Sequence, residues 1–180
     1  MAITYHDLYL KTRMALSSAG IEAAQLEARE ILCAAAEKTA EELYRDISLY
    51  TTDAIAEKTE ALQARRLAGE PIAYLLGEWS FCGLPFFVSP AALIPRVDTE
   101  MLAQLAMNRL KEHPGHTRIL DLCAGTGCVG LTAAALLKNT RAVLVDLYLG
   151  LPDAPAELEA LFDAPDGLCP QARIETQAPD

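Results

Sequence analysis

The chain has 180 residues, 52% of them apolar, and carries 15 basic against 25 acidic residues, for a net charge of −10. The apolar fraction excludes a disordered chain, and the length suits one ordinary domain or one small domain plus part of another. The acidic balance argues against a general binder of nucleic acid or of anionic membranes.

The cysteines argue against a disulfide scaffold and against a structural zinc site, because their number is odd and no Cys-x-x-Cys pair occurs. They are Cys33, Cys82, Cys123, Cys128 and Cys169. His113 and His116 flank Pro-Gly, which favours a turn, so we predict no metal site. The sequence shows no secretion signal and no apolar run of about 18 residues, which predicts a soluble cytoplasmic protein.

Residues 4–69 are predicted to be all-helical. Thr4 and Asp7 resemble a capping box that opens a first helix, which stops at Gly20. A second helix is predicted over about residues 22–36. Its apolar side would hold Leu26, Ile31 and Leu32.

Two further helices complete this region. Thr39 with Glu42 predicts a short third helix by the same cap chemistry, and Thr52 or Asp53 caps a fourth that ends at Gly69. Helices this short gain most of their stability by packing on one another. We therefore predict a small helical bundle over residues 1–69, without catalytic residues of its own.

Residues 70–100 change character and are predicted to link the bundle to a second domain. The stretch "EWSFCGLPFFV" alternates aromatic residues around Gly83 and Pro85, which predicts a β-hairpin. After "LIPRVDTE", Asp98 or Thr99 is expected to cap a helix over residues 100–111. Its apolar positions are Met101, Leu102, Leu105 and Leu110.

From Thr117 the pattern becomes strand, turn, helix and strand. "RILDL" and "RAVLVD" are apolar strands without alternation, which predicts that both of their faces are covered, as in a parallel sheet. The small-residue helix over residues 128–138 joins them in one right-handed βαβ unit. We assign residues 101–146 to this partial domain.

Residues 147–180 are expected to form an irregular acidic tail. They hold five of the ten prolines and seven acidic residues against one basic residue, Arg173. A short helix could form over residues 156–162, and no further strand is predicted.

The turn after the first strand is the candidate ligand site, because glycines there let a backbone approach a ligand closely. Gly125, Gly127 and Gly130 match the dinucleotide fingerprint G-x-G-x-x-G. With Asp121 before it, the same turn resembles motif I of Rossmann-like S-adenosylmethionine (SAM) methyltransferases. The Asp121 carboxylate could serve an ammonium group but would repel a pyrophosphate; its alternative role is a cap at the strand end.

Asp146 ends the second strand, 19 residues after Gly127. It is placed to accept hydrogen bonds from ribose hydroxyls of either ligand. A purely structural role is the alternative for this carboxylate too.

The segment from Gly69 to Gln104 favours the methyltransferase interpretation, because it resembles the interdomain region of the release factor glutamine methyltransferases. The resemblance covers about residues 4–146. Besides the glycine turn, its most specific pieces are "GEPIAY" at 69–74, and "LIPR" at 93–96 with "DTE" at 98–100. Members of that family carry a helical N-terminal domain, a β-hairpin and a Rossmann-like methyltransferase domain. A Rossmann dehydrogenase gives no reason for such a segment.

This resemblance implies transfer of a methyl group from SAM to the glutamine amide nitrogen in the GGQ motif of peptide chain release factors, with the bundle docking the substrate. Asp146 would hold the ribose, and Arg96, Thr99 and Glu100 would support the pocket. The cofactor would lie against Asp121, Cys123, Ala124, Gly125, Thr126 and Gly127.

Two positions depart from the family pattern. Val97 replaces a usual proline, which would loosen a rigid turn. Cys123 stands where glycine is frequent, which indicates that this position does not require a positive φ.

The family's catalytic Asn-Pro-Pro-Tyr motif does not occur in the sequence. Asn108 and Asn139 are the only asparagines, and neither precedes proline. We therefore identify no catalytic residue and expect a C-terminally truncated or disrupted family member. The alternatives are an inactive remnant that binds a release factor or SAM without turnover, and an NAD-binding Rossmann enzyme. Without later strands, "RILDL" would form a poorly covered edge, and residues 101–146 would fold poorly alone.

Overall fold

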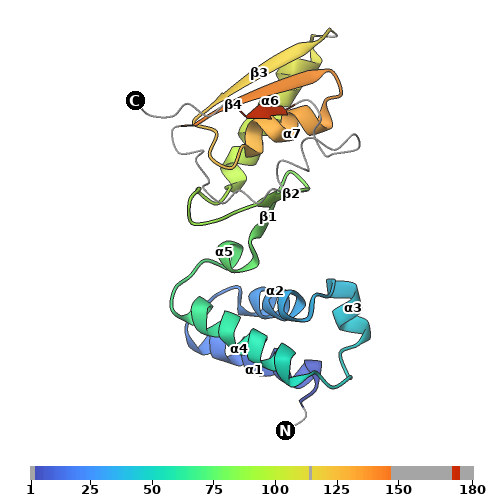
Figure 1. The fold of residues 1–180 in the computed structure, drawn as a ribbon, viewed down its shortest axis with the longest axis vertical. Helices are drawn as coiled ribbons and strands as arrows, with labels where there is room; N and C mark the ends of the chain where they lie inside the picture. The colour runs from blue at the N-terminus through green and yellow to red at the C-terminus, as the bar shows by residue number, and fades with distance from the viewer. Residues whose placement is uncertain (1–2, 114, 147–171, 175–180) are drawn as a thin grey trace. The chain divides into compact units, whose positions relative to one another are not determined.

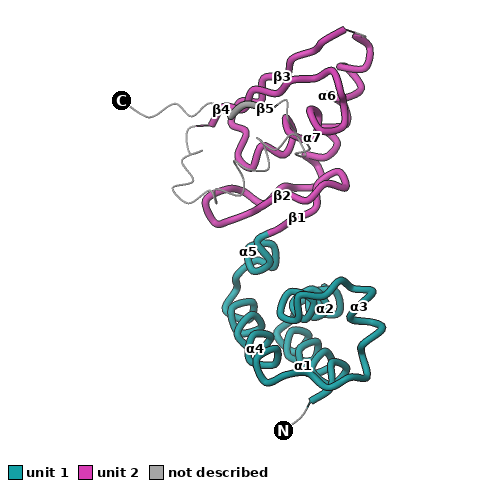
Figure 2. Tube along the Cα trace, turned by 45° about the vertical axis from the view of Figure 1, so that its right-hand side comes forward, with its two compact units in different colours: residues 1–77 teal, residues 78–180 magenta. Residues whose placement is uncertain are grey.

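The computed structural model describes residues 3–113, 115–146 and the backbone of 172–174. The chain divides into two compact units, residues 1–77 and 78–180, coloured teal and magenta in Figure 2. The predicted borders after residues 69 and 100 differ from this division. The predicted linker is shared between the two units, because its two halves pack into different hydrophobic cores.

The first unit is the predicted helical bundle with one additional short helix (Figure 1). All four predicted helices are present. The elements are α1 (Tyr5–Ser18), α2 (Ala24–Ala36), α3 (Ala40–Arg45), α4 (Asp53–Leu67) and α5 (Ile72–Leu76).

Threonine side chains begin three of these helices, as predicted. The hydroxyls of Thr4, Thr39 and Thr52 each accept a hydrogen bond from a backbone N–H three residues on. Glu42 completes a reciprocal capping box with Thr39. The Thr4 cap differs from a capping box, because its hydroxyl donates to the Asp7 carboxylate (2.6 Å).

The buried side of α2 differs from the prediction. Leu26 is half-exposed, whereas Glu27 is only 7% exposed and accepts two hydrogen bonds from the Arg66 guanidinium at 2.6 and 3.1 Å. Glu27 shares the inward face with residues at helical spacing, and the bidentate ion pair satisfies the buried charge. The other buried positions of α2 are Ala24, Ala28, Ile31, Leu32 and Ala35.

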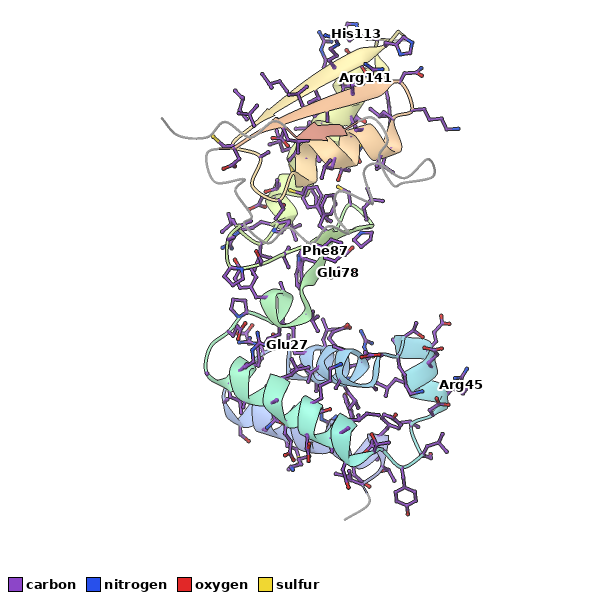
Figure 3. All side chains as sticks on the ribbon, viewed as in Figure 1. Glu27, Arg45, Glu78, Phe87, His113 and Arg141 are labelled. Atoms are coloured by element: carbon purple, nitrogen blue, oxygen red, sulfur yellow. The ribbon has the colours of Figure 1, made fainter. Side chains whose placement is uncertain are left out.

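The second unit begins with the predicted hairpin, β1 (Glu78–Phe81) and β2 (Leu84–Phe87). The strands are antiparallel, and the register pairs Glu78 with Phe87, both labelled in Figure 3. The two turn residues, Cys82 and Gly83, have φ of 50° and 78°. Positive φ at both positions is the requirement of a type I′ turn, whose twist matches that of the strands.

Helix α6 (Val97–Lys111) begins three residues earlier than predicted, and no side chain caps it. Asp98 and Glu100 instead lie in its first turn, where negative charge favours the helix dipole. Ala103 and Met107 are the buried residues of this helix. Three of the apolar positions named from the sequence are 57–67% exposed, namely Met101, Leu102 and Leu105.

Among its described residues, the rest of the unit contains a three-stranded parallel sheet with a crossover helix. The predicted strand-helix-strand order is confirmed, with β3 (Thr117–Leu122), α7 (Cys128–Leu136) and β4 (Thr140–Val145). A third strand, β5 (Ala172–Ile174), pairs with β4 and corrects the prediction that no strand follows. Three residues are too short to carry a periodic signal. The possible helix over residues 156–162 lies outside the described residues.

One face of the sheet is covered by α7 and the other is more open. Leu120 and Leu122 of β3 are 60% and 63% exposed, beside half-buried Val143 and Val145 in the register of β4. Among the described residues, the prediction of two covered faces is therefore wrong. Within the described strands, β3 forms the edge of the sheet, as expected. The expectation that residues 101–146 fold poorly alone stays a prediction.

None of the helices in the described part is long and apolar enough to span a membrane.

The turn between β3 and α7 alternates the sign of φ. The positive values are 58° at Cys123, 56° at Gly125 and 72° at Gly127. The inference drawn from Cys123 was therefore wrong, because this position does adopt the left-handed conformation. The chain must bend back toward the sheet here, where the Ala124 N–H donates to the Val145 carbonyl (3.2 Å). A non-glycine residue reaches this conformation at a cost of about 1–2 kcal/mol.

Gly127, the N-cap of α7, is required for a second reason. A Cβ atom there would lie 2.4 Å from Leu144 Cδ2 and 3.0 Å from Leu131 Cδ1. A substitution must therefore displace packed side chains of β4 and α7 in addition to straining the backbone. Gly125 has a similar φ but open space around the same position.

We predict that Gly127→Ala destabilises the second unit by more than about 3 kcal/mol, because backbone strain and overpacking add. The matched control is Gly125→Ala, which meets only the backbone strain and should cost about 1 kcal/mol. Urea unfolding followed by circular dichroism measures both. Equal losses would show that the contact with Leu144 does not determine the residue at position 127.

We predict that Cys123→Gly stabilises the second unit by about 0.5 kcal/mol. Glycine removes the strain of the left-handed conformation, and its greater freedom in the unfolded chain offsets part of the gain. The same unfolding assay measures this change. A loss of stability would mean that the thiol side chain contributes contacts that outweigh the backbone strain.

Candidate functional site

The candidate site lies at the carboxyl ends of β3 and β4, where the turn at residues 123–127 leads into α7 (Figure 1). Ligands of open parallel sheets bind at this end of the strands. The predicted residues Asp121 and Asp146 come from neighbouring strands, and both contact the polypeptide around the turn.

Asp146 holds the middle of the turn. Its Oδ2 accepts a hydrogen bond from the Gly125 N–H at 2.7 Å, across 21 positions of sequence. The carboxylate is half-buried directly after β4. It therefore fixes the turn to the next strand, and at least one of its oxygens is engaged by the protein.

Asp121 holds the first turn of α7. Its Oδ2 accepts from the Gly130 N–H at 2.8 Å, one of the N–H groups that a helix leaves unpaired at its start. A Cβ on residue 130 would lie 3.1 Å from the Asp121 side chain, which explains the third glycine of the fingerprint. Asp121 thus makes a structural contact with the start of α7, and its role toward a ligand stays a prediction.

The two carboxylates create a negative site. Burial raises the pKa of Asp121, and the charge of Asp146 raises it further, against the lowering effect of the Gly130 hydrogen bond. A pyrophosphate here would meet two carboxylates, and the Gly125 and Gly130 N–H groups are already paired with them. The site therefore suits a cationic ligand with hydroxyl groups better than a dinucleotide.

The side chains of the turn differ in what they face. Ala124 is buried in a cluster with Ala142 and Leu144, so it can line a ligand only through its backbone. The Thr126 side chain is half-buried, and the neighbouring Cys128 is a buried thiol whose pKa is raised chiefly by burial. Cys123, in contrast to Ala124 and Thr126, is exposed.

The predicted supporting residues gather at the start of α6. The Arg96 carbonyl accepts from the N–H groups of Thr99 (2.9 Å) and Glu100 (3.3 Å), while Glu100 Oε1 accepts from the Cys82 N–H (2.7 Å). Arg96 and Glu100 line an open depression of about 220 Å³ with Trp79, and no residue of the turn lines it. Any influence of these residues on the turn at residues 123–127 must therefore be transmitted by the elements that lie between them.

Other features of the described residues offer less chemistry. A larger depression, about 440 Å³, lies where α1 leads into α2 in the first unit and contains none of the motif residues. Within residues 3–113 and 115–146, no group of three His, Cys, Asp or Glu side chains could hold a metal ion.

Sequence reasoning missed the contact between Glu100 and Cys82. The dipeptide Cys82-Gly83 between aromatic residues was the available signal, because a two-residue hairpin turn exposes N–H groups that need partners.

Comparison with known proteins identifies relatives of both regions. Residues 7–77 match the family model described as PrmC N-terminal domain. The chain is 48% identical over 103 residues to the release factor glutamine methyltransferase of Escherichia coli (strain K12), an alignment covering 57% of this chain and 35% of that protein.

Two longer alignments cover more of the chain. The release factor glutamine methyltransferases of Aliivibrio fischeri and Nitratidesulfovibrio vulgaris are 36% and 35% identical to the chain over 146 and 166 residues. These alignments cover 81% and 89% of this chain, and 51% and 52% of those proteins. The chain thus spans between about one third and one half of these three curated relatives. These matches confirm the resemblance found in the sequence: the chain is similar to the release factor glutamine methyltransferases, and its residues 7–77 match the PrmC N-terminal domain.

Proposed function

We propose that this chain provides the docking domain and the cofactor-holding part of a SAM-dependent methyltransferase whose substrate is the GGQ glutamine of a peptide chain release factor. The second unit is then the first part of a Rossmann-like domain. The observation that carries the proposal is the pair of carboxylates, Asp121 and Asp146, on either side of the glycine turn.

The carboxylates around the turn suit SAM in charge. SAM carries a cationic sulfonium, which activates its methyl group, together with an ammonium group and ribose hydroxyls. Asp121 and Asp146 would stabilise positive charge, and a carboxylate after β4 accepts hydrogen bonds from hydroxyls. Three left-handed positions in the turn keep its backbone close to the site, with the Cys123 side chain at its surface.

The first unit is the proposed docking domain for the release factor. Its support is the match of residues 7–77 to the PrmC N-terminal domain and the names of the relatives. The proposal places the protein in the cytoplasm, where release factors act, and involves no direct contact with nucleic acid or membrane. The net charge of −10 agrees with a protein partner rather than an anionic polymer.

The proposal assigns no catalytic residue to these 180 residues. A neutral amide nitrogen is a poor nucleophile, so its N–H groups must be held and its lone pair aimed at the methyl carbon. The family's asparagine for this task has no counterpart, since neither Asn108 nor Asn139 precedes a proline. That observation favours the second candidate, binding of SAM or a release factor without turnover, for the 180 residues by themselves.

We predict that the 180-residue chain binds SAM and does not bind NADH in calorimetric titrations. Asp146→Asn should weaken SAM binding about tenfold, because the amide oxygen can still accept from Gly125 whereas the charge is lost. Similar circular dichroism spectra would show that this variant keeps the fold. Binding of NADH without SAM would overturn the cofactor assignment.

We predict further that the 180-residue chain does not transfer methyl groups to a purified release factor, although the two proteins associate. Radiolabelled SAM detects transfer, and sedimentation detects association. Methyl transfer at a measurable rate would show that an unrecognised residue of this chain orients the glutamine amide.

A further inference from the structure

We propose that Glu100 is a positioning residue that sets the geometry of the turn at residues 123–127 through the β-hairpin. The glutamate touches neither the turn nor the two carboxylates in any hydrogen bond of the described residues. Its effect on cofactor affinity rests on the proposed function, whereas its effect on the turn does not.

The first step is the hydrogen bond from the Cys82 N–H to Glu100 Oε1, 2.7 Å long. Cys82 has φ of 50°, a left-handed conformation that a non-glycine residue holds only when its surroundings impose it. The N–H of the first turn residue has no partner in the ladder of a two-residue hairpin. A charged acceptor therefore satisfies this N–H and fixes the turn relative to the first turn of α6.

The second step is the packing of the hairpin on α7. Phe81 and Phe86 meet edge to face, with ring centroids 5.9 Å apart, and both are at most 8% exposed. They share a cluster with Ala103 of α6 and Cys128, the first residue of α7. A shift of the hairpin therefore moves against the beginning of α7, because packed interiors transmit displacement.

The third step leads from the start of α7 into the turn. Cys128 follows Gly127 directly, and Leu131 packs against both the hairpin cluster and the cluster that contains Ala124 and Leu144. A Cβ on residue 127 would be 2.4 Å from Leu144, so Gly127 has little room to adjust. The hairpin thus packs against the first turn of α7. The N-cap of that helix, Gly127, is also the last residue of the turn at the candidate cofactor site.

The test compares Glu100→Ala with Glu100→Gln in the full chain. Glutamine keeps an oxygen that accepts from Cys82, whereas alanine leaves that N–H without its partner. In ligand-free protein, the Gly125 and Gly127 amide signals in nuclear magnetic resonance spectra report the turn directly. We expect both signals to shift in E100A and to stay at their wild-type positions in E100Q.

A titration with SAM extends the test to the proposed site. We expect the Kd for SAM to rise about tenfold in E100A and to stay within about twofold in E100Q. The fluorescence of Trp79, the single tryptophan, reports β1 in the same titration. Equal loss of affinity in E100Q and E100A would mean that the charge itself acts on the ligand, which overturns a positioning role.

Two further variants separate positioning from a general loss of stability. Met107→Ala opens a cavity in α6 away from the hairpin turn, and it should lower the unfolding midpoint without changing the Kd for SAM. Weakening of SAM binding in M107A as large as in E100A would overturn the proposal. Glu100→Asp, which keeps the charge but shortens its reach, should give intermediate shifts of the two glycine signals and replaces E100A if that variant does not fold.

The outcomes distinguish this inference from the proposed function. If the wild-type protein fails to bind SAM, the proposed function is contradicted. The Gly125 and Gly127 signals of ligand-free protein would still show whether Glu100 sets the geometry of the turn. Glycine signals at wild-type positions in folded E100A, or in folded E100D, would overturn the inference even if wild-type protein binds SAM.

Discussion

The hydrogen bond between the Gly125 N–H and the Asp146 carboxylate is the contact on which the second unit depends. It ties the turn after β3 to the end of β4 at 2.7 Å. A turn that doubles back this tightly needs three left-handed residues, and the contact between Gly127 and Leu144 leaves no space for a side chain at one of them. The backbone N–H of the turn needs an acceptor, which the acid after β4 provides, and the close packing at Gly127 leaves room only for glycine.

The same contact restricts what the site can bind. A glycine-rich turn before a helix usually offers free N–H groups to phosphates. Here Asp146 and Asp121 already take the N–H groups of Gly125 and Gly130. The carboxylates leave a negative potential in place of an anion cradle, which favours a cation. The fingerprint G-x-G-x-x-G alone does not carry this distinction, because it records where the backbone bends and not which groups its N–H donors meet.

The sequence predicted those features that nearby residues determine. Thr39 and Glu42 form their capping box within four residues, and the hairpin follows from a local turn with aromatic strands. The errors concern packing against distant elements. Leu26 was expected inside because it is apolar, but Arg66 on α4 makes Glu27 the better occupant of the inward face. The conformation of Cys123 depends on a bond with β4, and β5 is too short to have a pattern. The roles of the site residues toward a ligand stay predictions.

The residues around Arg96 make contacts within the fold itself. Its carbonyl accepts from the Thr99 and Glu100 N–H groups at the start of α6, and Glu100 in turn supports the hairpin. Val97 is the first helical residue, a position where proline is favoured because its fixed φ suits the helix and its missing N–H is not needed there. Valine at this place, 81% exposed, loses only that preorganisation, a change of about 0.4–1 kcal/mol. The departure from the family pattern thus leaves the Glu100 carboxylate and its contact with Cys82 intact.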